Sequence, residues 1–172
     1  LYILSGVNLS CPLLGCEIVV NISGEFSLGR NSMIIAGLVS VNASNASFLT
    51  GSVINVTALA GAPPAQTSGT PDGVQGSGGG HGGRGASCVI DNTKLPDDVW
   101  GGDPYAWSSL DEPVSYGSKG GTTSKDEKYG GEGGGRIWLE ARSSIDLSGS
   151  DLADGGDGGI KGGGGSGGSI FV

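Results

Sequence analysis

The chain has 172 residues, a net charge of −8 and 37 glycines. Because phosphate binding needs positive charge along a groove, this acidic chain with few clustered Lys or Arg side chains is not expected to bind nucleic acid. No apolar run reaches the length of a membrane helix, so membrane attachment is expected only through segments absent from this sequence. Six glycines lie in residues 1–60 and 31 in residues 61–172. So many glycines indicate that residues 61–172 are specified by backbone geometry more than by side-chain chemistry.

Residues 1–61 have the pattern of short strands. Between residues 17 and 60 the apolar and β-branched strings EIVVNIS, EFSLG, SMIIAG, LVSVNAS, ASFLTG and SVINVTALAG each end at Gly, Asn or Ser, with no helical period. The segment is therefore predicted to form strand-rich coils.

The same segment carries five Asn-x-Ser/Thr sequons, none of them blocked by proline. Such crowding within strand-like sequence predicts a glycosylated face in the secretory pathway, on an extracellular or cell-surface ectodomain. The predicted glycosylation sites are Asn8, Asn21, Asn42, Asn45 and Asn55.

The chain has three cysteines, Cys11, Cys16 and Cys88, so one thiol is left without an internal partner. Together with strand-like sequence at both ends, this odd number suggests a piece of a longer protein. Cys11 and Cys16 can pair only if Pro12 and Gly15 fold the segment back, because five extended residues span about 16 Å and a disulfide needs Cα atoms about 5.5 Å apart. A bond from either one to Cys88 is equally open.

Residues 62–136 are predicted to form a glycine-rich excursion that contains an aromatic and acidic insertion at residues 87–119. The insertion either folds over the coils and supplies missing core, or presents a sugar-stacking platform. The candidate glycan-binding residues are Trp100, Asp103, Tyr105 and Trp107. A flexible Gly/Ser linker is the alternative for the glycine runs, but apolar strings follow each run at once.

Internal repeats connect the two ends of the chain. VNIS from Val20 matches VNAS from Val41, with Phe26 matching Phe48, and Arg136 matches Ser169. Spacings of about 20 to 35 residues are typical of solenoids. We therefore predict an all-β fold, a parallel β-solenoid resembling a right-handed β-helix with long ordered glycine-rich loops, in which residues 137–172 form further coils of one continuous domain.

The Gly-His-Gly string at residues 80–82 resembles one motif of the polygalacturonases, parallel β-helices that hydrolyse pectin with paired aspartates. An inverting glycosidase needs two carboxylates about 6.5–9.5 Å apart on one face. The adjacent Asp97 and Asp98 would point to opposite sides of an extended segment, and the expected Asn-Thr-Asp is reversed at residues 91–93. No catalytic residue is therefore predicted, and a pectin-type hydrolase or lyase-like domain is the alternative function.

No metal or cofactor is predicted. His81 is the only histidine and no CxxC pair lies near it, which leaves too few ligands for zinc. Asp151, Asp154 and Asp157 recur every three residues, but they do not match the order of the calcium-binding nonapeptide.

The strings VNISGEFSLGRNSMIIAG, LAGAPPAQTSGTPDGVQGSGGGHGGRGASC, VWGGDPYAWSSLDEPVSYGSKGG and SDLADGGDGGIKGGGGSGGSIFV cover much of the chain. They resemble a family of very large plant glycine-rich membrane proteins with long secreted ectodomains. The resemblance implies a plant secretory location near the N-terminal part of such an ectodomain, and it carries over no catalytic residues. The expected function is a non-catalytic structural or adhesive scaffold that contacts cell-wall polysaccharide, another extracellular protein or the remainder of its own longer chain.

Overall fold

The structure is a computed structural model that describes residues 1–69, 76–87, 100–105, 111–122 and 130–172. About 35% of these residues lie in strands and none lies in a helix. The strands are β1 (Tyr2–Ile3), β2 (Asn8–Ser10), β3 (Glu17–Asn21), β4 (Glu25–Leu28), β5 (Met33–Ile35), β6 (Leu38–Phe48), β7 (Val53–Asn55), β8 (Arg136–Leu147), β9 (Ser150–Leu152) and β10 (Ser169–Phe171).

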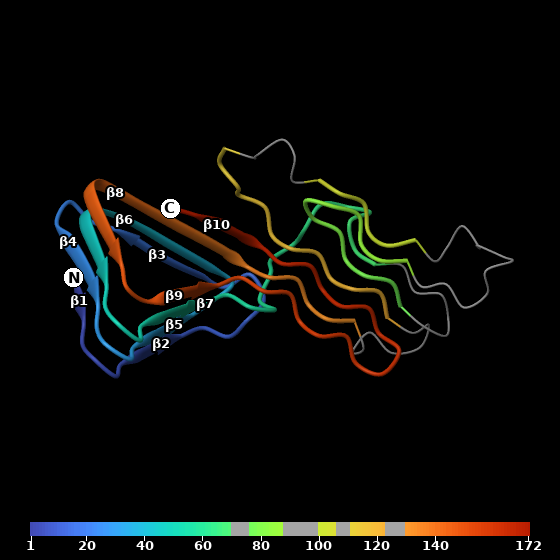
Figure 1. Ribbon diagram of the computed structural model, residues 1–172, viewed down its shortest axis with the longest axis horizontal. Helices are drawn as coiled ribbons and strands as arrows, with labels where there is room; N and C mark the ends of the chain where they lie inside the picture. The colour runs from blue at the N-terminus through green and yellow to red at the C-terminus, as the bar shows by residue number, and fades with distance from the viewer. Residues whose placement is uncertain (70–75, 88–99, 106–110, 123–129) are drawn as a thin grey trace, which may run out of the picture.

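The strands form two parallel sheets at one end of the molecule (Figure 1). Sheet A has the order β1-β4-β6-β8-β10, with β3 also paired to β6. Sheet B has the order β2-β5-β7-β9. The long strand β6 pairs with β3 along its first half and with β4 along its second half, while β8 pairs with its other edge. β6 is therefore the centre of sheet A.

The core is a thin apolar layer built from the inward faces of both sheets. Alternate residues of β6, such as Val39 and Val41, are fully buried, as side chains of a half-buried strand should be. Sheet B contributes Ile34 and Ile54. The rings of Phe26 and Phe48 lie 5.6 Å apart, and they are the two largest buried side chains.

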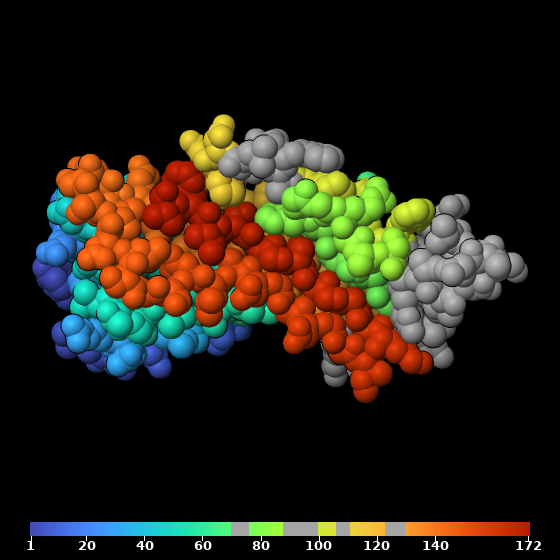
Figure 2. All heavy atoms as spheres, viewed as in Figure 1, coloured from blue at the N-terminus to red at the C-terminus, as the bar shows by residue number. Residues whose placement is uncertain are grey.

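The glycine-rich segments form a second part, called here the glycine bundle: residues 76–86, 100–103, 117–122, 130–135 and 155–168. Its extended backbones run side by side beyond the sheets (Figure 1) and hydrogen-bond directly to one another. The N–H of Gly79 donates to the carbonyl of Gly164 at 3.0 Å, and the N–H of Gly131 donates to Gly163 at 2.9 Å. These bonds satisfy backbone groups that few side chains could reach. On the face in Figure 2, residues of the C-terminal part, coloured orange to red, form a continuous band from the sheets to the bundle.

Glycine is required in the bundle for close approach of backbones. A Cβ at Gly102 would lie 1.7 Å from the Thr67 carbonyl oxygen. Among the glycines that the structure describes, only Gly6, Gly15 and Gly51 have a positive φ, and all three lie outside the bundle. Most bundle glycines are thus needed because a side chain would clash with neighbouring backbone, whereas these three provide turns.

The prediction of a β-solenoid resembling a right-handed β-helix is wrong. The described residues form two parallel sheets without a closed solenoid. A coil interior must be filled by side chains, and the glycine runs have none, so they pack by backbone hydrogen bonds in a separate bundle. The repeats did identify neighbouring strands: Val20 pairs with Val41 and Arg136 pairs with Ser169. The match of Phe26 with Phe48 is wrong, because Leu28 pairs with Phe48.

A disulfide joins Cys11 to Cys16, with Cα atoms 6.1 Å apart. Gly15 makes the turn that this requires, with φ at +66°. Cys88 lies outside the described residues. The bond indicates an oxidising compartment. In the part of the chain that the structure describes, no helix is long and apolar enough to span a bilayer.

Removing this disulfide by the double substitution Cys11→Ser and Cys16→Ser should lower the free energy of unfolding by about 2 kcal/mol, the loop-entropy value for so short a loop. Urea denaturation of the two proteins measures the difference. Reduction of the parent protein should reproduce the loss and should leave the double variant unchanged. Equal stability of oxidised parent and double variant would contradict the expectation.

Candidate functional site

The outward face of sheet A carries a groove of about 320 Å³, called here the outer groove. Strand register builds it from two neighbouring rows of side chains. One row runs through Glu17, Leu38, Arg136 and Ser169, and the other runs through Val19, Ser40, Trp138 and Phe171. The lining residues are Glu17, Val19, Leu38, Ser40, Arg136 and Trp138.

Trp138 forms the wall of the groove on the side of β10. Its ring stacks on Phe171, with centroids 4.1 Å apart and planes inclined by 21°. Its other neighbour in the row is Ser40, whose small side chain leaves space between Trp138 and Val19. The groove thus has a fixed aromatic wall beside an open floor.

Arg136 supplies a positive charge to the groove. Its guanidinium lies 4.7 Å from the centre of the Tyr116 ring. Burial raises the pKa of the Tyr116 hydroxyl, the charge of Arg136 lowers it, and Glu17 raises it, which places both charges near this hydroxyl. Among the described residues no carboxylate oxygen lies within 4 Å of the Arg136 guanidinium. The cation is therefore held by an aromatic ring, without a carboxylate partner in the described part of the chain.

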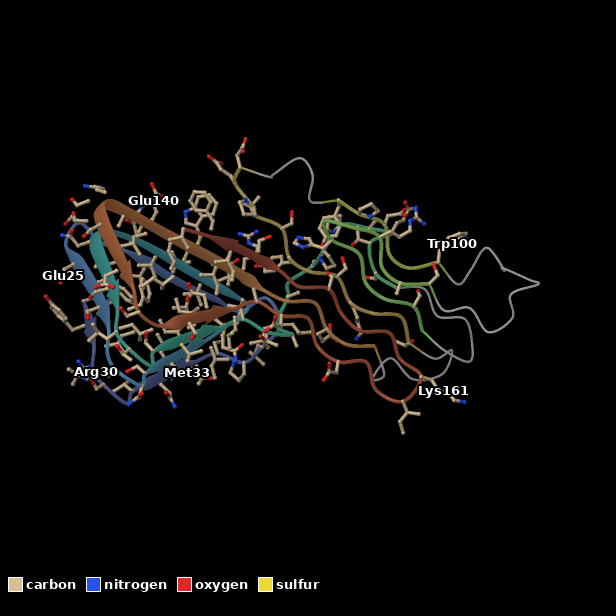
Figure 3. The ribbon with its side chains drawn as sticks, viewed as in Figure 1. Glu25, Arg30, Met33, Trp100, Glu140 and Lys161 are labelled. Carbon is tan, nitrogen blue, oxygen red and sulfur yellow. A yellow bond between two sulfur atoms is a disulfide. The ribbon has the colours of Figure 1, made fainter. Side chains whose placement is uncertain are left out.

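Of the predicted glycan-binding residues, the three that the structure describes lie away from the outer groove, at the glycine bundle: Trp100, Asp103 and Tyr105. Trp100 is 43% exposed, and Figure 3 shows it far from Glu140 of sheet A. Arg84 lies 5.7 Å from the Trp100 ring centre and pairs with Asp103 at 2.6 Å. Arg84 thus contacts both Trp100 and Asp103, and glycan binding by these residues stays a prediction. Trp107 lies outside the described residues.

Tyr105, the remaining member of that predicted platform, has a packing role. Its ring lies 5.1 Å from the ring of His81. Its hydroxyl donates to the carbonyl of Tyr116, and its hydroxyl oxygen lies 3.1 Å from the Ser118 hydroxyl oxygen. Burial raises the pKa of the Tyr105 hydroxyl. The residue joins segments of the bundle and leaves little of itself for a ligand.

The five sequon asparagines all lie on strands, and none is buried. Asn21 and Asn42 pair in register on the outward face of sheet A, and the Asn42 Nδ2 donates to Glu140 at 3.1 Å. Asn45 accepts from Ser144 at 2.9 Å. Asn8 and Asn55 belong to sheet B, where the Asn55 side chain accepts from the backbone N–H of Thr57. Glycosylation of the five stays a prediction.

The groups considered for catalysis or metal binding do not assemble into a site in the described part of the chain. His81 is half-buried, its Nε2 has no hydrogen-bond partner, and burial lowers its pKa. No group of three or more His, Cys, Asp or Glu that could hold a metal occurs among the described residues. Asp97 and Asp98 lie outside them.

Asp151 occupies a position that sequence reasoning missed. It pairs with Ile54 in the inward row of sheet B, and its two carboxyl oxygens are buried without a hydrogen-bond partner. Desolvation raises the pKa of this carboxyl. The sequence pattern of β9 could have indicated this burial. Side chains alternate between the two faces of a strand, and Asp151 is the central residue of this three-residue strand, with exposed residues on both sides.

The substitution Asp151→Asn should raise the melting temperature at pH 7 by a few degrees and leave it unchanged at pH 3. The pKa of Asp151 is raised in the folded protein because burial disfavours the charged carboxylate. The folded protein is therefore most stable below the ordinary pKa of 3.8, where Asp151 is protonated, and it loses stability as the pH rises through the folded pKa. Melting curves at both pH values test this. The exposed control Asp154→Asn should change neither, and a lower melting temperature of Asp151→Asn at pH 7 would refute the expectation.

Comparison with protein families, with curated proteins and with solved structures finds no match to this chain.

Proposed function

We propose that this chain is a non-catalytic structural and adhesive scaffold segment of an extracellular protein, of the plant glycine-rich membrane type that its sequence resembles. The observation that supports this most is the glycine bundle. Its packing comes from backbone hydrogen bonds between segments far apart in the sequence, which fixes a shape while offering few side chains for chemistry.

The hydroxyl groups inside the bundle also serve its structure. Ser118 Oγ donates to Thr67 Oγ1 at 2.6 Å. Ser166 Oγ donates to the Gly80 carbonyl at 3.0 Å and accepts from the backbone N–H of Ser118. Because buried polar groups that are fully hydrogen-bonded rigidify a structure, these contacts favour a framework over a reactive site.

The strand-rich part provides the surface for adhesion. Sheet A presents a face with polar and aromatic side chains, and the Cys11–Cys16 disulfide suits an oxidising compartment. Cell-wall polysaccharide or another extracellular protein is the partner that this scaffold would contact.

Hydrogen–deuterium exchange and an activity assay together test the scaffold role. We expect slow exchange at those amides of the runs 130–135 and 162–168 that donate to backbone carbonyls of other segments, such as the amides of Gly131, Gly134, Gly163 and Ser166. We also expect no release of reducing sugar or unsaturated product from a panel of wall polysaccharides. Rapid exchange in both glycine runs, or turnover that is lost on Asp97→Ala or Asp98→Ala, would overturn the proposal.

A further inference from the structure

We propose that the outer groove binds an oligosaccharide containing hexuronic acid, with Trp138 stacking on a sugar ring and Arg136 pairing with the sugar carboxylate. This inference rests on the proposed adhesive role and gives it a ligand class and a site. The scaffold function itself does not depend on it.

The groove has the amphipathic lining that a pyranose requires. Val19 and Leu38 form an apolar floor, while Ser40, Glu17 and Arg136 place polar groups around it. A pyranose ring has C–H groups on its faces and hydroxyls around its edge, so it can lie against apolar and aromatic surface while its edge hydrogen-bonds. A volume of about 320 Å³ is at the lower end of ligand pockets, which suits a short stretch of a longer glycan.

The aromatic wall is fixed before a ligand arrives. Phe171 stacks on one side of Trp138, and the register of β8 with β10 holds the two rings together. The opposite neighbour in the row is Ser40, which is too small to cover the indole. A ring already held in place loses little conformational freedom on binding, so its contact area contributes to affinity.

The charge of Arg136 selects an acidic sugar over a neutral one. A guanidinium stays charged at any relevant pH and binds a carboxylate through two parallel hydrogen bonds. Arg136 has no carboxylate within 4 Å among the described residues, although the whole chain carries a net charge of −8. Arg84, which also lies over an aromatic ring, is instead neutralised by Asp103. Arg136 is therefore the better candidate for an anionic ligand.

Glu17 orients such a ligand. It lies two strands away from Arg136 in the same row, across Leu38, a separation of about 9–10 Å between backbones. Its carboxylate repels a sugar carboxylate and accepts hydrogen bonds from hydroxyls. The acidic end of a uronic acid should therefore face Arg136, and its hydroxyl edge should face Glu17.

Calorimetric titration of the 172-residue chain with tetragalacturonate and with neutral galactotetraose tests the site. We expect the acidic ligand to bind more tightly, with an affinity that falls as salt rises. Arg136→Gln should weaken tetragalacturonate binding by about 10-fold to 100-fold and leave the neutral ligand unaffected. Trp138→Ala should weaken both, and Trp138→Phe should restore part of the loss. Trp100→Ala and Arg84→Gln are the matched controls at the other aromatic–arginine pair, and they should bind as the parent does.

The indole N–H resonance of Trp138, assigned from the Trp138→Phe spectrum, provides a second measurement that keeps the test valid if Trp138→Ala does not fold. It should shift on titration with tetragalacturonate. Equal affinity for the two ligands overturns the uronate assignment. Absence of binding, or full binding by both Arg136→Gln and Trp138→Phe without a shift of that resonance, overturns the site. None of these results bears on the scaffold role, which fails through rapid exchange or turnover.

Discussion

Gly163→Ala should destabilise the glycine bundle by about 3 kcal/mol, whereas Gly164→Ala at the next position should not destabilise it. A Cβ at Gly163 would lie 1.8 Å from the Ser77 carbonyl oxygen and 2.4 Å from its carbon. Backbone cannot rotate away as a side chain does, so two hydrogen-bonded segments would have to separate. At Gly164 the nearest atom is the Gly156 carbonyl oxygen, at 3.8 Å, which is an ordinary contact.

The two substitutions should differ in sign as well as in size. Neither Gly163 nor Gly164 has a positive φ, so an alanine at either position can adopt the native backbone conformation without strain. At Gly164 the substitution therefore mainly reduces the freedom of the unfolded chain, which stabilises by about 0.4–1 kcal/mol. Urea denaturation gives the free energies, and hydrogen exchange at residues 76–80 locates the loss. Equal effects of the two alanines would show that the backbones are not packed this closely.

Phe48→Ala should lower the free energy of unfolding by about 3–5 kcal/mol. Phe48 is 1% exposed, pairs with Leu28 across the strands and contacts Phe26 in the core. Truncation to alanine removes the ring from an apolar layer too thin to refill the cavity. Leu13→Ala is the control, because Leu13 is 68% exposed and should change stability by less than about 0.5 kcal/mol.

Thermal unfolding followed by two probes extends this prediction. Near-ultraviolet circular dichroism reports the aromatic packing, and hydrogen exchange at residues 162–168 reports the bundle. Because β8 begins where the run 130–135 ends, the loss at Phe48 should reach the bundle as well. A loss below about 1 kcal/mol for Phe48→Ala would mean that the core does not depend on this ring.

The neighbouring strands could be predicted from the sequence, but the positions of the glycine runs in a separate bundle could not. Val20 and Val41 carry the same alternation of apolar residues, and register is fixed wherever one face of a strand is buried. The glycine runs contain no alternation, so nothing in their composition distinguishes a corner of a coil from a segment of a bundle. Their positions depend on backbone hydrogen bonds, which any residue but proline can make.

The outer groove was missed for a different reason. Glu17 and Arg136 are far apart in the sequence, and they share a face only because β6 pairs with both β3 and β8. A partial signal existed, since the alternation in Arg136-Ile137-Trp138 places the arginine and the tryptophan on one side of a strand. Trp100 was predicted to bind a glycan because acidic residues surround it in the sequence. The engagement of Asp103 by Arg84 follows from the folded bundle alone.

The central position of β6 also determines when sheet A can be completed during synthesis of the chain. Asn42 on β6 and its partner Glu140 on β8 are 98 residues apart, so this edge of β6 stays unpaired until the residues between β7 and β8 have been made. Contacts between such distant residues form slowly. An unpaired apolar strand edge is meanwhile a template for pairing with other chains. Because β8 is made late, the edge of β6 stays unpaired in the growing chain. Chains truncated before residue 136 are therefore expected to aggregate through this edge.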